Sequence, residues 1–132
     1  MRIFKTRALA KITRQYGISD ASLVTAVDEA MRGLIDADLG GHVIKQRLAR
    51  PGEGKRGGFR MLIGFRSDLA IFLFGFAKNE RENIDRDLLK TLREIVAMWF
   101  AADEKTIAQA LADRILIEIH HGNEDKSKPT AH

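Results

Sequence analysis

The spacing of apolar residues changes near Gly41, and this change limits the folds that the chain can adopt. Before Gly41, apolar residues recur every three or four positions, which predicts two amphipathic helices. The first is expected from residue 6 to Gly17, and the second from its N-cap Ser19 to Leu34. After Gly41 the spacing falls to two, which predicts strands over residues 43–49, 59–66 and 71–77. Helices followed by strands predict an α+β fold, with the two N-terminal helices packed on an antiparallel β-sheet.

Two further segments fit the same domain. A short strand is expected over residues 2–5, ahead of the first helix. Helical spacing returns over residues 79–100, with Asn83 or Asp85 as the N-cap. The sheet is therefore expected to carry C-terminal helices in addition to the N-terminal pair.

The C-terminal part of the chain has weaker patterns. Asp103 is expected to cap a short helix that ends near Ala112. Residues 115–119 alternate as in a strand, which either adds to the sheet or forms part of an interface. Residues 122–132 are small, polar and charged, and this composition predicts a disordered tail.

No cysteine occurs among the 132 residues, of which 45% are hydrophobic. The missing thiols exclude a disulfide scaffold, a thiolate zinc site and a cysteine nucleophile, and a chain of this size can bury its own core. The charged N-terminal residues lack the apolar stretch of a secretory signal. The longest apolar run, residues 69–77, is far shorter than the roughly 20 residues that cross a bilayer. We therefore expect a single cytoplasmic domain without a membrane segment.

The net charge of +4 is unevenly distributed along the chain. Residues 1–14 contain five basic and no acidic side chains, whereas residues 15–41 contain one basic and five acidic ones. Residues 42–66 contain a single acid, Glu53, and seven basic residues: Lys45, Arg47, Arg50, Lys55, Arg56, Arg60 and Arg66. Two basic blocks of this kind suit a polyanion or an acidic protein partner.

Motifs for metal and nucleophilic chemistry are missing. The four histidines are His42, His120, His121 and His132, and none has the spacing of a metal site. The sequence has neither a G-x-S-x-G motif nor a Walker loop. We therefore expect no metal and no cofactor.

The second basic block is expected to form a surface. Lys45 and Arg47 lie two positions apart on one predicted strand, and so emerge on one face. Arg60 and Arg66 share a face of the next strand, and Lys78 follows the third. Such a cationic face would bind phosphates, with an ordinary solvated polar face as the alternative.

Three stretches of the sequence resemble the RelE superfamily of bacterial toxins, most closely its HigB-like branch. They are KQR at residues 45–47, GGFRMLIGF at 57–65 and FAKNERENI at 76–84. The resemblance covers residues 1–100 as a RelE-like toxin domain, and residues 101–121 extend that domain. It implies a RelE-like fold and a toxin of a type II toxin–antitoxin system that cleaves mRNA in the ribosomal A site and so inhibits translation. Such an mRNA interferase uses no metal, and it forms a hetero-oligomer with a cognate antitoxin.

The resemblance also implies roles for individual residues. Lys45, Arg60 and Arg81 match the catalytic positions, with Lys45 in proton transfer and Arg60 on the phosphate in the transition state. Basic residues match RNA-binding positions or lie beside them: Arg47, Arg50, Lys55, Arg56, Arg66 and Lys78. Asn79 stands where RelE has an arginine, and Ile84 or Asp85 where it has a stacking tyrosine.

Several alternatives remain open at this point. A ParE-like toxin of the same fold would inhibit DNA gyrase without cutting RNA, and a catalytically silent member would serve as an interaction module. Lys45 and Arg47 together with Arg60 favour RNA cleavage over gyrase inhibition, because a toxin that only binds a protein has no need for converging phosphate ligands. The stripe of Arg7, Lys11 and Arg14 on the first helix meets ribosomal RNA or the antitoxin, or is a solvated face. Phe59 and Phe65 face away from Arg60, so alternation predicts that they belong to the core.

Overall fold

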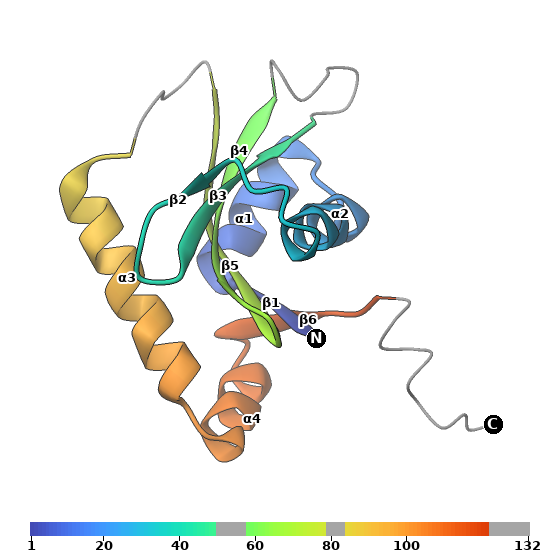
Figure 1. Ribbon diagram of the computed structural model, residues 1–132. Coiled ribbons are helices and arrows are strands. Elements are labelled where there is room, and N and C mark those ends of the chain that lie inside the picture. Colours follow the sequence, from blue (N-terminus) through green and yellow to red (C-terminus); the bar gives the residue numbers. More distant parts are fainter. Residues whose placement is uncertain (50–57, 79–83, 122–132) are drawn as a thin grey trace.

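The structure is a computed structural model that describes residues 1–49, 58–78 and 84–121. Four helices and six strands form within these residues, which confirms the α+β class (Figure 1). In chain order they are β1 (Arg2–Thr6), α1 (Arg7–Tyr16), α2 (Asp20–Met31), β2 (Ala37–Asp38), β3 (Val43–Leu48), β4 (Phe59–Arg66), β5 (Leu69–Ala77), α3 (Arg86–Ala101), α4 (Glu104–Ala112) and β6 (Leu116–Ile119).

All six strands belong to one sheet, in the order β2-β3-β4-β5-β1-β6. Strands β3, β4 and β5 form the predicted antiparallel meander. The first strand pairs in parallel with β5, placing Ile3 opposite Ala70. Strand β6 pairs antiparallel with β1, so the segment after residue 100 adds a strand to the sheet. The parallel pairing was not predicted, because the alternation of a strand defines its two faces but not its neighbours.

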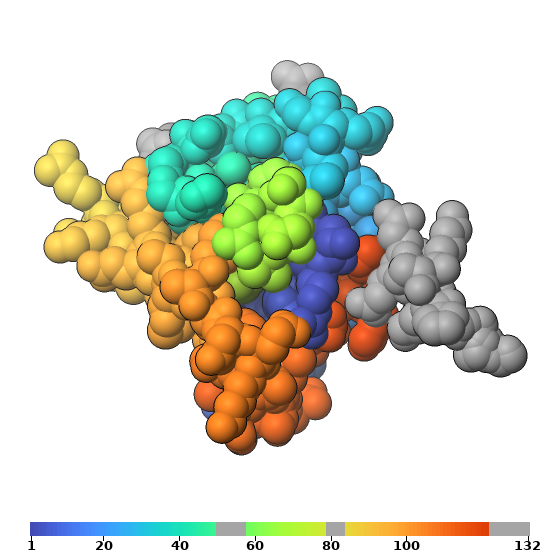
Figure 2. All heavy atoms as spheres, turned by 60° about the horizontal axis from the view of Figure 1, so that its bottom comes forward, coloured from blue at the N-terminus to red at the C-terminus, as the bar shows by residue number. Residues whose placement is uncertain are grey.

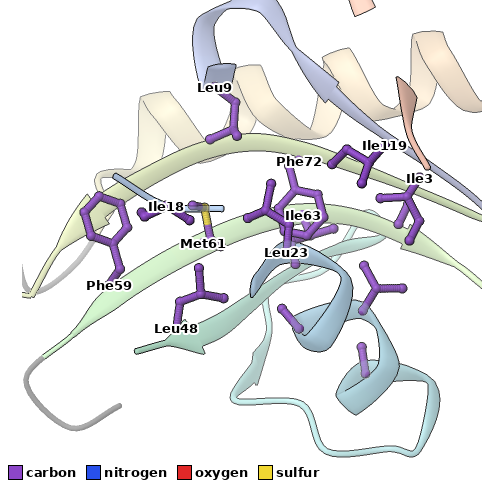
Figure 3. Packing of buried hydrophobic residues seen from close by; sticks show 14 of the residues in the cluster. Ile3, Leu9, Ile18, Leu23, Leu48, Phe59, Met61, Ile63, Phe72 and Ile119 are labelled. Atoms are coloured by element: carbon purple, nitrogen blue, oxygen red, sulfur yellow. The ribbon is translucent and has the colours of Figure 1, made fainter. Parts of the chain in front are cut away.

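Helices cover both faces of this sheet and give the domain two apolar cores. On one face, Leu9 of α1 and Leu23 of α2 pack with Met61 and Ile63 of β4 (Figure 3). On the other face, α3 and α4 pack on a separate cluster that includes Leu62. Successive residues of β4 therefore alternate between the two cores, as its sequence predicts.

The helix ends follow local capping rules. The side chains of Thr6, Ser19, Asp85 and Asp103 each accept a hydrogen bond from a backbone N–H in the first turn of a helix. Gly17 ends α1 with a φ of 67°, in the left-handed region that glycine adopts without strain. These observations confirm the predicted ends at Gly17, Ser19 and Asp103, and they select Asp85 over Asn83 as the cap of α3.

Two predicted boundaries were wrong. The second helix ends at Met31, and Leu34 is 57% exposed instead of lying on the apolar face of that helix. The chain turns at Gly33, with a φ of 82°, and then forms the short strand β2, which was not predicted. The helix expected from residue 79 begins at Arg86. Residues 79–83 and the predicted tail 122–132 lie outside the described residues. None of the described helices is long and apolar enough to cross a membrane.

Candidate functional site

Lys45, Arg47 and Arg60 lie on one face of two adjacent strands. In the register of β3 and β4, Arg47 is directly opposite Arg60, and Lys45 is directly opposite Leu62. Leu62 packs in the core beneath α3, so all three cations belong to the face that α3 covers farther along the sheet. Directly opposite residues of a sheet have Cβ atoms about 4.5–5.5 Å apart. The prediction that these three side chains share one surface is therefore confirmed.

The three cations differ in burial. Arg60 is 7% exposed, whereas the side chains of Lys45 and Arg47 are 26% and 51% exposed. A guanidinium nitrogen of Arg60 donates to the carbonyl oxygen of Phe59 at 3.4 Å, and Phe76 of β5 lies opposite Arg60 on its other side. A largely buried arginine is shielded from water, which strengthens its interaction with an anion.

The carboxylate of Asp36 lies between Lys45 and Arg47. Its Oδ1 is 2.9 Å from Nε of Arg47, and its Oδ2 is 3.7 Å from Nζ of Lys45. Asp36 directly precedes β2, which pairs with β3 and so brings the acid beside the basic pair. Asp36 was not predicted as a site residue, because its contact with the basic pair depends on the pairing of a two-residue strand that has no recognisable sequence pattern.

Gln46, between the two basic residues, holds this arrangement from the opposite face of β3. Its side chain is almost fully buried, and its Oε1 accepts a hydrogen bond from the backbone N–H of Asp36 at 2.9 Å. Its Nε2 donates to the carbonyl oxygens of Ala26 in α2 and of Leu34, at 3.1 and 3.0 Å. The connection from α2 to β2 is thus fixed to the strand that carries Lys45 and Arg47.

Lys78 and Arg66 lie at opposite ends of the sheet. The backbone N–H of Lys78 donates to the carbonyl oxygen of Gly58 at 3.1 Å, which places this exposed lysine at the end where β4 begins, near Arg60. Arg66 ends β4, about 20 Å from Arg60 at 3.3 Å per residue. The expectation that Arg66 converges with the other cations was therefore wrong: alternation gave the right face, but the two arginines lie six positions apart along the extended strand.

Arg66 is bound by groups at its own end of the sheet. Its Nε lies 2.7 Å from Oδ1 of Asp68, its Nη1 donates to the carbonyl oxygen of Phe100 at 3.4 Å, and its guanidinium lies 4.6 Å from the centre of the Phe100 ring. The hydrogen bond from Arg66 lowers the pKa of the Asp68 carboxyl. Figure 2 looks onto this end, where the turn between β4 and β5 (yellow-green) lies between the N-terminal strand (dark blue) and α3 (orange).

The remaining predicted site residues are Arg50, Lys55, Arg56 and Arg81, which lie outside the described residues. Phe59 is fully buried and contacts Tyr16 edge to face, with ring centres 4.7 Å apart, and Phe65 packs against the same core. Both are therefore core residues, as predicted. Over the part of the chain that the structure describes, no three histidine or acidic side chains gather in a group that could hold a metal ion.

The chain matches the model of a known protein family. Residues 1–119 match the family described as the RelE toxin of the RelE / RelB toxin-antitoxin system. Comparison with curated proteins gives no match to this chain. The family match confirms the resemblance found in the sequence and extends past residue 100 to include α4 and β6.

Proposed function

The chain belongs to the RelE toxin family, and we propose that it is a ribosome-dependent endoribonuclease that cleaves mRNA in the A site. As a toxin of a toxin–antitoxin system, it has an antitoxin as its partner. Ribosomes and mRNA as targets, action in the cytoplasm and membership of the HigB-like branch are part of the proposal. The observation that carries it is the placement of Lys45, Arg47 and Arg60 on one face of β3 and β4.

This placement suits the cleavage of a phosphodiester by the neighbouring 2′-hydroxyl. The 2′-oxygen loses its proton and attacks phosphorus, the bond to the 5′-oxygen breaks, and that oxygen takes up a proton. Negative charge accumulates on the phosphate in the transition state, and fixed cations lower the barrier. We assign Arg60 to this charge, Lys45 to proton transfer, and Arg47 with Lys78 to RNA positioning. Arg81 is proposed as a further catalytic residue from the family resemblance alone.

The test uses purified protein with ribosomes translating a defined message, followed by primer extension on the bound mRNA. We expect new 5′ ends at the codon in the A site, and none on the same message without ribosomes. Lys105→Ala removes an exposed positive charge on α4, away from Lys45, Arg47 and Arg60, and should cleave like the unmodified chain. It is the control for variants of those three cations. A parallel supercoiling assay tests inhibition of gyrase. Gyrase arrest without new 5′ ends would overturn the nuclease proposal in favour of the ParE-like alternative.

A further inference from the structure

Asp36 is the acid that contacts both Lys45 and Arg47, and the nuclease proposal above gives it no role. We propose that Asp36 is a positioning residue that holds these two cations side by side for reaction with RNA. This inference rests on the proposed function, which supplies the roles of Lys45 and Arg47.

The contact is better fixed than an ordinary surface ion pair. Exposed ion pairs contribute little, because two long side chains must give up their freedom and water screens the charges. The side chain of Asp36 is only 16% exposed, less than either cation, and each of its two oxygens faces a different partner. One carboxylate therefore restrains two flexible side chains at once.

The backbone beneath the carboxylate is fixed as well. Gln46 accepts from the N–H of Asp36 and donates to carbonyl oxygens of Ala26 and Leu34. Residues 45, 46 and 47 are consecutive on β3, so the outer two contact the carboxylate on one face while the middle one anchors its backbone from the other. The short KQR segment thereby uses every side chain to define the position of a single acid.

The geometry also leaves donors for a phosphate. Asp36 accepts from Nε of Arg47 at 2.9 Å, and a guanidinium carries four more N–H bonds on its two terminal nitrogens. Those terminal nitrogens can bind a phosphate while Nε stays on the carboxylate. Asp36 thus sets the plane of the guanidinium without occupying the whole group.

A carboxylate at this place also repels RNA. Loss of its charge should therefore leave RNA binding unchanged or make it tighter. Loss of positioning should slow the chemical step, because small displacements of a reacting or stabilising group lower the rate steeply. This opposite response of binding and cleavage separates a positioning role from a purely repulsive or purely structural one.

The experiment compares Asp36→Asn with Asp38→Asn, which removes the same charge two residues away. Asp38 accepts from the N–H of Gly40, a contact that asparagine can keep. Two quantities are measured: the single-turnover cleavage rate on programmed ribosomes, and the dissociation constant for ribosomes whose message carries a 2′-deoxynucleotide at the cleavage point. For Asp36→Asn we expect cleavage slowed by about tenfold or more, with equal or tighter binding. Asp36→Glu should recover part of the rate, and Asp38→Asn should behave as the unmodified chain.

Thermal melting checks that each variant is folded. A second test repeats Asp36→Asn in an Arg47→Ala chain. There the reduction in cleavage rate caused by Asp36→Asn should be smaller, because one of the two cations that Asp36 positions is missing. Cleavage by Asp36→Asn as fast as by Asp38→Asn would overturn the inference, as would binding weakened in proportion to the rate. If the unmodified chain leaves the message uncut, the proposed function itself fails, which is a different result from equal rates among active variants.

Discussion

Arg60 and Arg66 project from the same face of β4, yet the two ends of this strand surround a guanidinium with different groups. Arg66 lies against the carboxylate of Asp68 and the ring of Phe100. Arg60 has Arg47 opposite it on one neighbouring strand and Phe76 on the other. Cations on two adjacent strands are thus brought together at the Arg60 end, whereas Arg66 is paired with an acid of its own turn.

The largest expected effect comes from Arg60→Met, which keeps much of the side-chain volume but removes the charge. Cleavage on programmed ribosomes should fall by about 100-fold to 1,000-fold, because a fixed cation at the transition-state phosphate is lost. Arg66→Met is the matched change at the other end of the strand and should cause a far smaller loss. Primer extension measures both rates, and melting curves confirm folding. Equal losses in the two variants would remove the distinction between the ends.

A second, smaller effect is expected midway between the two arginines. A Cβ added to Gly64 would lie 2.7 Å from Cγ2 of Val96, so this glycine lets α3 approach the sheet. Gly64→Ala should lower the free energy of unfolding by about 1–3 kcal/mol through overpacking. Denaturant or thermal unfolding measures the change, and Val96→Ala in the same chain should restore part of it. A stable Gly64→Ala protein would show that α3 shifts without cost.

The smallest effect concerns pH at the Arg66 end. The hydrogen bond from Arg66 lowers the pKa of Asp68 below its ordinary value of 3.8, so the folded state favours the carboxylate. The resulting stabilisation is present at neutral pH and is lost as the pH falls through the lowered pKa. Asp68→Asn should therefore reduce the melting temperature slightly at pH 7. Melting curves from pH 7 to pH 2 should converge for the two proteins, and a difference that persists at the acid end would contradict this account.

The same comparison shows what the sequence could predict. The helix caps at Ser19 and Asp103 were predicted correctly, because each cap contacts a backbone N–H only three positions along the chain. Alternation along single strands correctly placed Lys45, Arg47 and Arg60 on one face. Each of these features depends on residues that are close in the chain.

The missed features depend on distant segments. Asp36 reaches Lys45 and Arg47 only because β2 pairs with β3, and the amide of Gln46 reaches back twenty positions to Ala26. The parallel pairing of β1 with β5 joins residues that are 67 positions apart, such as Ile3 and Ala70. A local pattern carries no information on which of several possible strands becomes a neighbour.

The pairing of β1 with β6 has a consequence for the order of folding. The strands that carry the three cations are consecutive in the chain, whereas β1 and β6 are the first and last elements among the described residues. Contacts between nearby residues form faster than contacts that close a long loop. We therefore expect β3, β4 and β5 to associate during synthesis, while one edge of β1 waits for residues 116–119 to leave the ribosome. Because synthesis adds about 5–20 residues per second, we expect the cationic face to form a few seconds before the six-stranded sheet is complete.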